Sequence, residues 1–118
     1  MLLRRACHAL GLRYRLSVKG LPGKPDLVFL GACVAVFVDG DFWHGRDLDA
    51  RIARLSTGHN AAYWVAKVTS NVARDRRQDA ALRELGWRVV RVWESEVRTD
   101  PVGAAKRVAE VARARRSL

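Results

Sequence analysis

The chain has 118 residues, 49% of them hydrophobic, and its 22 Lys and Arg against 12 Asp and Glu give a formal net charge of +10. This length is near the commonest domain size and allows one hydrophobic core, while no apolar run approaches the roughly 20 residues of a membrane span. The start has no apolar segment followed by a cleavage site, and the two cysteines have no metal-binding spacing. We therefore expect one cytoplasmic domain over residues 1–118 with reduced thiols.

The positive charge is concentrated in three places. Residues 1–20 contain five basic and no acidic side chains, residues 74–77 contain three arginines, and residues 106–116 contain five basic side chains against Glu110. Such a distribution favours a polyanionic partner, usually nucleic acid. The alternative is an ordinary solvated surface in an arginine-rich protein.

The first half of the chain predicts a helix and three strands. Residues 2–10 form a short helical pattern that Gly11 ends, and residues 12–18 alternate between apolar and polar as a strand with one basic face does. A proline-stiffened turn then leads through Asp26 into an apolar strand. The uninterrupted apolar run 33–38 predicts a strand buried on both faces, and the short Gly31-Ala32 link predicts a hairpin between these two strands.

The second half predicts helices on either side of one more strand. A helical pattern runs over residues 61–85 and ends at Gly86, with Thr69-Ser70 as a place where it could divide into two helices. Residues 87–93 are β-branched and aromatic, as in a strand, and Asp100-Pro101 is typical of a helix start. The expected order is α-β-β-β-α-β-α, an α/β protein with a mixed central sheet flanked by helices.

The predicted hairpin would gather chemically useful side chains at one edge of the sheet. Asp26 would lie near Asp39 and His44. Two carboxylates and an imidazole are the groups that a metal-assisted hydrolase uses for metal binding and proton transfer. Each residue also has a plainer reading, because Asp26 could cap a turn, Asp39 could form one, and His44 could be an ordinary loop residue. Phe42 and Trp43 cannot both point inward, so one of them is suited to stacking on bases or wedging between them.

One face of the long predicted helix carries polar side chains. Lys67, Asn71 and Asp75 are spaced at i, i+4 and i+8, and Arg74 borders that face. Asp75 could instead form a surface pair with Arg74 or Arg76.

Together these residues resemble the very short patch repair (Vsr-type) DNA mismatch endonucleases, which belong to the restriction-endonuclease-like nucleases. The matching pieces follow the family's order over residues 2–95, and the Pro-Gly-x-Pro-Asp and Phe-Trp-His motifs are jointly specific. The pieces are Gly11-Leu12-Arg13-Tyr14-Arg15, Leu21-Pro22-Gly23-Lys24-Pro25-Asp26, Val36-Phe37-Val38-Asp39-Gly40-Asp41-Phe42-Trp43-His44, Tyr63-Trp64, Asn71-Val72-Ala73-Arg74-Asp75-Arg76-Arg77, Leu85-Gly86-Trp87-Arg88-Val89 and Val92-Trp93-Glu94.

The resemblance implies a restriction-endonuclease-like αβββαβ core and a set of catalytic residues. Asp26 matches the family's metal-binding aspartate, and Val38 would offer its main-chain carbonyl to the same Mg²⁺. His44 matches the histidine that activates the attacking water, and Asp75 matches the aspartate that supports it. Asp39 is the remaining carboxylate that we expect in the catalytic set.

The resemblance also implies how double-stranded DNA is bound. Phe42 and Trp43 match the aromatics that wedge into the duplex beside a mismatch. Lys67 and Asn71 lie on the helical face that approaches the mismatched pair, and Arg74 borders it. A mismatched step costs less to unstack than a paired one, so aromatic wedging gives selectivity.

The chain departs from the family at three points. Asp41, Arg46 and Ser95 stand where family members commonly hold a structural zinc, so we expect no such zinc. The N-terminal extension of the family, with its catalytic-site glutamate, is expected to be missing because the chain begins about where that glutamate would stand. Phe37 occupies a position at which many related nucleases carry a glutamate, which leaves few carboxylates for a metal.

These features predict a Mg²⁺-dependent endonuclease that nicks one strand next to a T·G mismatch in very short patch repair. We expect a monomer in the bacterial cytoplasm, associated with the nucleoid, without a membrane or an obligate protein partner. The alternatives are a DNA-binding module with weakened catalysis and a related restriction or defence nuclease without mismatch preference.

Overall fold

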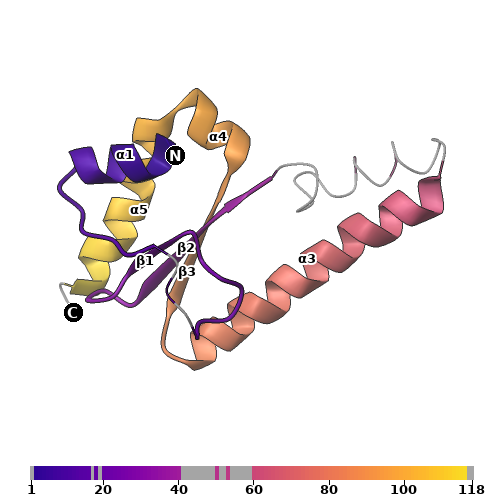
Figure 1. The fold of residues 1–118 in the computed structure, drawn as a ribbon, viewed down its shortest axis with the longest axis horizontal. Helices are drawn as coiled ribbons and strands as arrows, with labels where there is room; N and C mark the ends of the chain where they lie inside the picture. Colours follow the sequence, from indigo (N-terminus) through magenta and orange to yellow (C-terminus); the bar gives the residue numbers. More distant parts are fainter. Residues whose placement is uncertain are drawn as a thin grey trace.

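The computed structural model describes residues 2–16, 18, 20–40, 50, 53 and 60–116, which form a mixed sheet with helices on both faces (Figure 1). The elements in chain order are α1 (Leu2–Ala9), β1 (Leu27–Phe29), β2 (Val34–Asp39), α3 (Ala61–Glu84), β3 (Arg88–Trp93), α4 (Glu94–Thr99) and α5 (Pro101–Arg116). Among these helices, none is both long enough and apolar enough to cross a membrane. The prediction of an α/β protein with a mixed sheet is confirmed.

The sheet has the order β1-β2-β3. β1 runs antiparallel to β2, with Leu27 opposite Val36, which confirms the predicted hairpin. β2 runs parallel to β3, with Val36 opposite Val90, and α3 lies in the long connection that a parallel pair requires. β2 is therefore the central strand and receives hydrogen bonds from both sides.

The predicted strand over residues 12–18 is wrong for the described part of that segment. It makes one isolated antiparallel bridge, between Arg15 and Val28, and no continuous ladder. The physical reason is the shortness of β1, which has three residues, of which the middle one, Val28, bonds to Arg15. The next backbone N–H toward the N-terminus on this edge, that of Asp26, donates instead to the Val36 carbonyl of β2 at 2.9 Å, so the ladder does not continue. The αβββαβ order that the resemblance implies is accordingly not confirmed.

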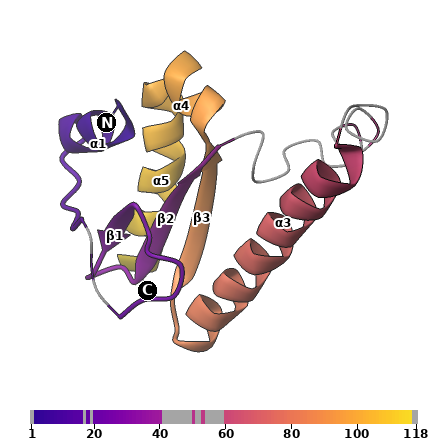
Figure 2. The same ribbon diagram turned by 45° about the vertical axis from the view of Figure 1, so that its right-hand side comes forward.

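Both faces of β2 are covered, as its apolar run predicts. Val34 and Val36 enter the larger core, where α1, α4 and α5 contribute residues, while Ala35 and Phe37 pack with Leu82 of α3 on the opposite face. Figure 2 shows the same division, with α3 on one side of the sheet and the other helices on the other side. β2 is therefore held by a neighbouring strand at each edge and by packed side chains on each face, which fixes the position of its C-terminal end.

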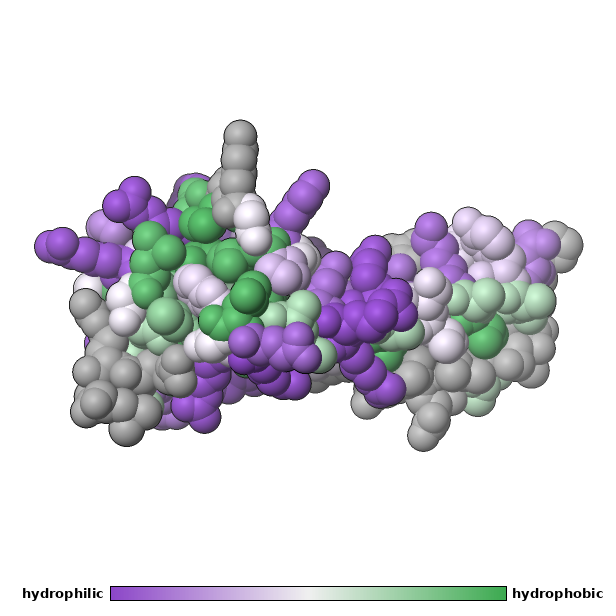
Figure 3. Space-filling model, turned by 90° about the horizontal axis from the view of Figure 1, so that it is seen from below, coloured by the Kyte–Doolittle hydropathy of each residue, from purple (hydrophilic) through white to green (hydrophobic). Residues whose placement is uncertain are grey.

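α3 is a single helix of 24 residues, without a break at Thr69-Ser70. Its buried residues Val68, Asp75 and Leu82 are seven apart, so they lie on one stripe of the helix, and Leu82 packs with Ala35 and Phe37 of the sheet. Gly86 has a φ of 88°, which confirms it as the residue that ends the helix. Seen from below, hydrophilic surface covers the middle of the molecule, where α3 passes beside the sheet (Figure 3).

The sequence interpretation missed α4 and placed α5 correctly. Val97 is the only buried residue of α4, so six residues with one apolar contact give no helical periodicity. At the start of α5, the Asp100 carboxylate accepts a hydrogen bond from the Gly103 N–H at 3.0 Å, which confirms the predicted N-cap.

Candidate active site

Asp26 is fixed just before β1, beside the C-terminal end of β2. Its N–H donates to the Val36 carbonyl at 2.9 Å, and its Oδ2 accepts the Val38 N–H at 2.7 Å. The preceding turn has Gly23 at φ 80° and Lys24 at φ 52°, and a Cβ on Gly23 would lie 2.8 Å from a side-chain atom of Gln78. The turn therefore packs closely on α3 and delivers an exposed carboxylate to the end of the hairpin.

The Val38 carbonyl faces the same side as Asp26. In a strand, the N–H and C=O of one residue point toward the same neighbour, and the Val38 N–H points to the Asp26 carboxylate. β1 begins at Leu27, so no strand residue of β1 lies opposite Val38. A carboxylate oxygen and a main-chain carbonyl oxygen are thereby directed to one place at the end of the sheet.

A cleft of about 420 Å³ opens at this point between the sheet and α3. It brings together five residues that the sequence singled out, namely Asp26, Val38, Asp39, Arg74 and Asp75. Lys24 and Arg91 also line the cleft, so three carboxylates stand against three cations and the formal charges balance. The cleft is therefore far less positive than the chain as a whole.

Arg91 of β3 holds the deepest part of the cleft together. Its Nη1 donates to both oxygens of Asp39, at 2.9 and 3.1 Å, and its Nε and Nη2 contact Asp79 of α3, with the Nη2–Oδ1 distance at 2.7 Å. The Oδ1 atom of Asp75 lies 3.8 Å from Nη1, and the guanidinium stacks 4.1 Å above the centre of the Phe37 ring. One cation thus connects β2, β3 and α3.

The electrostatics of Arg91 follow from its position. Burial would lower the pKa of its guanidinium, but the hydrogen bonds and charges of Asp79 and Asp39 outweigh burial and raise the pKa. Asp39 and Asp75 are 5% and 7% exposed, so each is a buried carboxylate with a cation beside it. The immediate partner of Asp39 is therefore Arg91.

Sequence reasoning missed Arg91 and Asp79. A signal was present, because Arg91 interrupts an apolar strand at a position that alternates with the buried Val90 and Val92, while Asp75 and Asp79 are four residues apart on a helix. A cation on a strand and two carboxylates on one helical face predict an ion-pair cluster once the strand and the helix are known to pack.

The other expected site residues fall into two groups. Lys67 and Asn71 lie on α3, on the N-terminal side of Asp75, and Ser95 lies on α4. Phe42, Trp43 and His44 lie outside the described residues. The same is true of Asp41 and Arg46, so the zinc prediction remains a prediction at these two positions.

Metal binding by this site would depend on oxygen ligands. Within residues 2–40 and 60–116, as far as they are described, no three His, Cys, Asp or Glu side chains gather in a metal-binding group. The Asp26 carboxylate and the Val38 carbonyl are hard oxygen donors, and Mg²⁺ commonly takes one or two carboxylates together with water and substrate phosphates. These residues fit such an ion.

Comparison with known proteins identifies the class as DNA endonuclease. The family model for DNA mismatch endonuclease Vsr matches residues 1–51. The type II nicking enzyme V.NmeDIP of Neisseria meningitidis serogroup C is 40% identical over 116 residues, which cover 98% of this chain and 77% of that relative. The chain belongs to the Vsr family.

Two further relatives support this assignment. The type II nicking enzyme V.XorIIP of Xanthomonas oryzae pv. oryzae is 44% identical over 95 residues, covering 80% of this chain and 68% of the relative. The DNA mismatch endonuclease Vsr of Escherichia coli K12 is 38% identical over 89 residues, covering 75% of this chain and 54% of the relative. The predicted resemblance is thus confirmed, and DNA is the substrate.

Proposed function

We propose that this chain is a Mg²⁺-dependent endonuclease that nicks one DNA strand next to a T·G mismatch in very short patch repair. The observation that carries the proposal is the placement of Asp26, whose carboxylate is held by the Val38 N–H beside the outward-facing Val38 carbonyl. This arrangement lies in a cleft with Asp75, at the end of a strand buried on both faces. A rigid support of this kind keeps oxygen donors at fixed positions.

Asp26 and the Val38 carbonyl would hold the Mg²⁺ ion. When bound, the ion supplies charge neutralisation for the phosphate and for the leaving oxygen. Asp39 acts in this proposal through Arg91: by holding that cation it fixes the end of β2, where Val38 stands. The site would then offer the ion one side-chain carboxylate, Asp26, and water and phosphate oxygens would supply its other ligands.

His44 is the proposed general base. A neutral imidazole near pH 7 accepts the proton of the attacking water, and a carboxylate partner orients the ring and stabilises its protonated form. Asp75 is the proposed partner, because it is 7% exposed in the cleft that contains Asp26 and is fixed to the sheet through Arg91.

The DNA contacts of the proposal come from α3 and from the segment that follows β2. Lys67 and Asn71 approach the mismatched pair, while Phe42 and Trp43 enter the duplex beside it. Arg74, whose side chain is 50% exposed at the cleft, is placed to contact a backbone phosphate. In this proposal the enzyme binds DNA as a monomer.

The test compares T·G and C·G duplexes of one sequence at fixed salt, with binding and single-turnover nicking measured on each. We expect the wild type to nick the T·G duplex preferentially. Trp43→Ala should lose more of this preference than of its total affinity, because unstacking costs less at a mismatch whereas the electrostatic attraction is equal for both duplexes. Trp87→Ala, at the opposite end of the sheet near the start of β3, is the matched control for loss of an indole.

A second candidate function is a nicking enzyme without mismatch preference. It is favoured by the names of relatives such as V.NmeDIP and V.XorIIP, which are called type II nicking enzymes. Equal nicking of the T·G and C·G duplexes would support it against mismatch repair. Binding without nicking of either duplex would instead support a DNA-binding module with weakened catalysis.

A further inference from the structure

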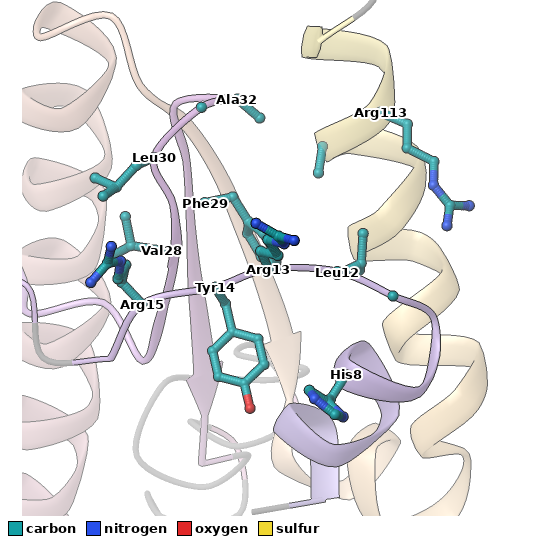
Figure 4. Close-up of a pocket in the computed structure, with 13 residues that line it drawn as sticks. His8, Leu12, Arg13, Tyr14, Arg15, Val28, Phe29, Leu30, Ala32 and Arg113 are labelled. Carbon is teal, nitrogen blue, oxygen red and sulfur yellow. The ribbon is translucent and has the colours of Figure 1, made fainter.

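A second pocket, of about 700 Å³, opens beside the outer edge of β1, away from the cleft that contains Asp26 (Figure 4). It is bounded by α1, by the extended segment that follows Gly11, by β1 with its turn, and by the last turns of α5. Its lining includes His8, Arg13, Arg15 and Arg113 but no carboxylate. The lining of the candidate active site has three carboxylates that balance its three cations, so this second pocket is the more positive of the two.

Main-chain hydrogen bonds at Arg15 hold the extended segment, which also carries Arg13, against β1. The Arg15 N–H donates to the Val28 carbonyl at 2.8 Å, and the Val28 N–H donates back at 2.9 Å. Alternate residues of an extended segment point to opposite sides. Leu12 and Tyr14 pack on the core, and Arg13 and Arg15 are consequently exposed.

The remaining basic side chains reach the pocket from the helices. Figure 4 shows His8 projecting from α1 and Arg113 from α5, in addition to Arg13 and Arg15. Arg113 Nη2 donates to the Leu10 carbonyl at 3.3 Å, which anchors it at the rim. Within the described part of the chain, neither Arg13 nor Arg15 forms an ion pair, so their guanidinium charges are not neutralised there.

The chemistry of this lining suits a phosphodiester backbone. A guanidinium matches a phosphate with two parallel hydrogen bonds, and three of them without a carboxylate attract a polyanion. The floor is apolar, formed by Val28, Phe29 and the half-exposed Leu30. A volume of about 700 Å³ accommodates a sugar against this floor in addition to a phosphate at the arginines.

The pocket and the nicking site lie along the same strand. Asp26 precedes β1 and Leu30 follows it, and four residue steps of extended chain span about 13 Å. DNA rises about 3.4 Å per nucleotide along its axis, so this span corresponds to about four base pairs. A duplex that runs along β1 from Asp26 would therefore reach the pocket.

We propose that this arginine-lined pocket beside β1 is a second DNA-backbone site, which binds a phosphate about four base pairs from the nicked bond. The proposal rests on DNA as the substrate and does not require the T·G preference. Its role is to orient the duplex on the protein and to supply affinity that is independent of base sequence.

The test uses the double variant Arg13→Gln, Arg15→Gln, with Arg83→Gln, Arg98→Gln as the control. Both doubles remove two exposed positive charges, and the control pair lies on α3 and α4, outside the pocket. Binding to a duplex without Mg²⁺ is measured at several salt concentrations. We expect the pocket variant to lose about tenfold or more in affinity, and its salt slope to fall by about one to two units, with a smaller change in the control.

A scan of the duplex with single neutral methylphosphonates locates the contact. In the wild type, affinity should fall most for a substitution about four base pairs from the nick. The same substitution should have little further effect in the Arg13→Gln, Arg15→Gln variant, because the two changes remove one interaction. Thermal unfolding with inorganic phosphate serves as the comparison for a free anion.

Three results would overturn the proposal. The first is equal loss of affinity in the pocket and control variants, and the second is a methylphosphonate effect that persists in the pocket variant. The third is a rise in the thermal midpoint with inorganic phosphate while no methylphosphonate position loses its effect in the Arg13→Gln, Arg15→Gln variant. That result would make the pocket a free-phosphate site. Absence of T·G preference with arginine-dependent binding intact would refute the proposed function and leave this inference standing.

Discussion

Arg91 of β3 and Asp39 of β2 form a two-oxygen ion pair, with Nη1–oxygen distances of 2.9 and 3.1 Å. The sheet register explains the pair. Arg91 lies directly opposite Phe37, on whose ring its guanidinium stacks, and Asp39 is the next residue of β2 on the same face. The ion pair therefore joins the two parallel strands at the end that carries the candidate active site.

Removal of the Arg91 charge should destabilise the fold strongly. Arg91→Gln leaves Asp39 and Asp79 without their cation, and we expect a loss of about 3 kcal/mol in the free energy of unfolding, since breaking a buried pair leaves an uncompensated charge. Urea unfolding measures the loss. Arg98→Gln is the control, because its pair with Glu94 is 67% and 53% exposed and is worth less than about 0.5 kcal/mol. Equal effects of the two substitutions would contradict this assignment.

The charge of Asp26 should be essential for nicking and dispensable for folding. In Asp26→Asn, the amide oxygen still accepts the Val38 N–H, so the fold and the turn are retained. Nicking in Mg²⁺ should fall to background, whereas DNA binding should persist or tighten because a negative charge facing phosphate is removed. Asp100→Asn is the matched control, since asparagine also caps a helix and the same charge is lost. A variant that nicks at the wild-type rate would exclude Asp26 as the metal ligand.

Purified protein should contain well under one zinc per chain. By the resemblance, Asp41, Arg46 and Ser95 would stand at the family's zinc-ligand positions, and Arg and Ser do not substitute for thiolates. Elemental analysis measures the content, and a chelator should leave the thermal midpoint nearly unchanged. Stoichiometric zinc would reveal a ligand set that the sequence did not disclose.

Stability should fall in alkaline solution in a manner that depends on Cys7. Burial raises the pKa of this thiol from 9.0 to about 11. Between these two values the unfolded chain has released a proton that the folded chain retains, so the free energy of unfolding decreases as pH rises. Urea midpoints from pH 8 to pH 11 should decline less steeply for Cys7→Ala than for the wild type. Cys33→Ala, at a partly exposed cysteine, is the control for loss of a thiol.

Local patterns predicted the elements whose structure is decided locally. The apolar run 33–38 predicted a doubly buried strand, Gly86 predicted the end of α3, and Asp100 predicted the N-cap of α5. In each case a few adjacent residues fix the outcome, through burial of side chains or through the conformational freedom of glycine. The resemblance to the Vsr family rested on equally local motifs, and it is confirmed.

Local patterns failed where the outcome depended on a neighbour. Residues 12–18 alternate as a strand does, yet a ladder needs a partner of sufficient length, and β1 offers Arg15 a single outward-facing residue, Val28. α4 was missed for the opposite reason, because six residues with one buried side chain have no periodicity to detect. For residues 12–18 the alternation was correctly recognised, but the length of the available partner strand decided the structure.

The sequence alone determined which side chains are available to the site: the carboxylates of Asp26, Asp39 and Asp75, and the aromatic and histidine residues that follow β2. Only the tertiary structure decided how the carboxylates are used. Asp26 is exposed and bonded to the main chain of Val38, whereas Asp39 is buried against Arg91. Arg91 is 52 residues from Asp39 in the chain, and the two meet because β3 returns parallel to β2 after α3. An ion pair across that distance is set by sheet register and burial, which no local pattern encodes.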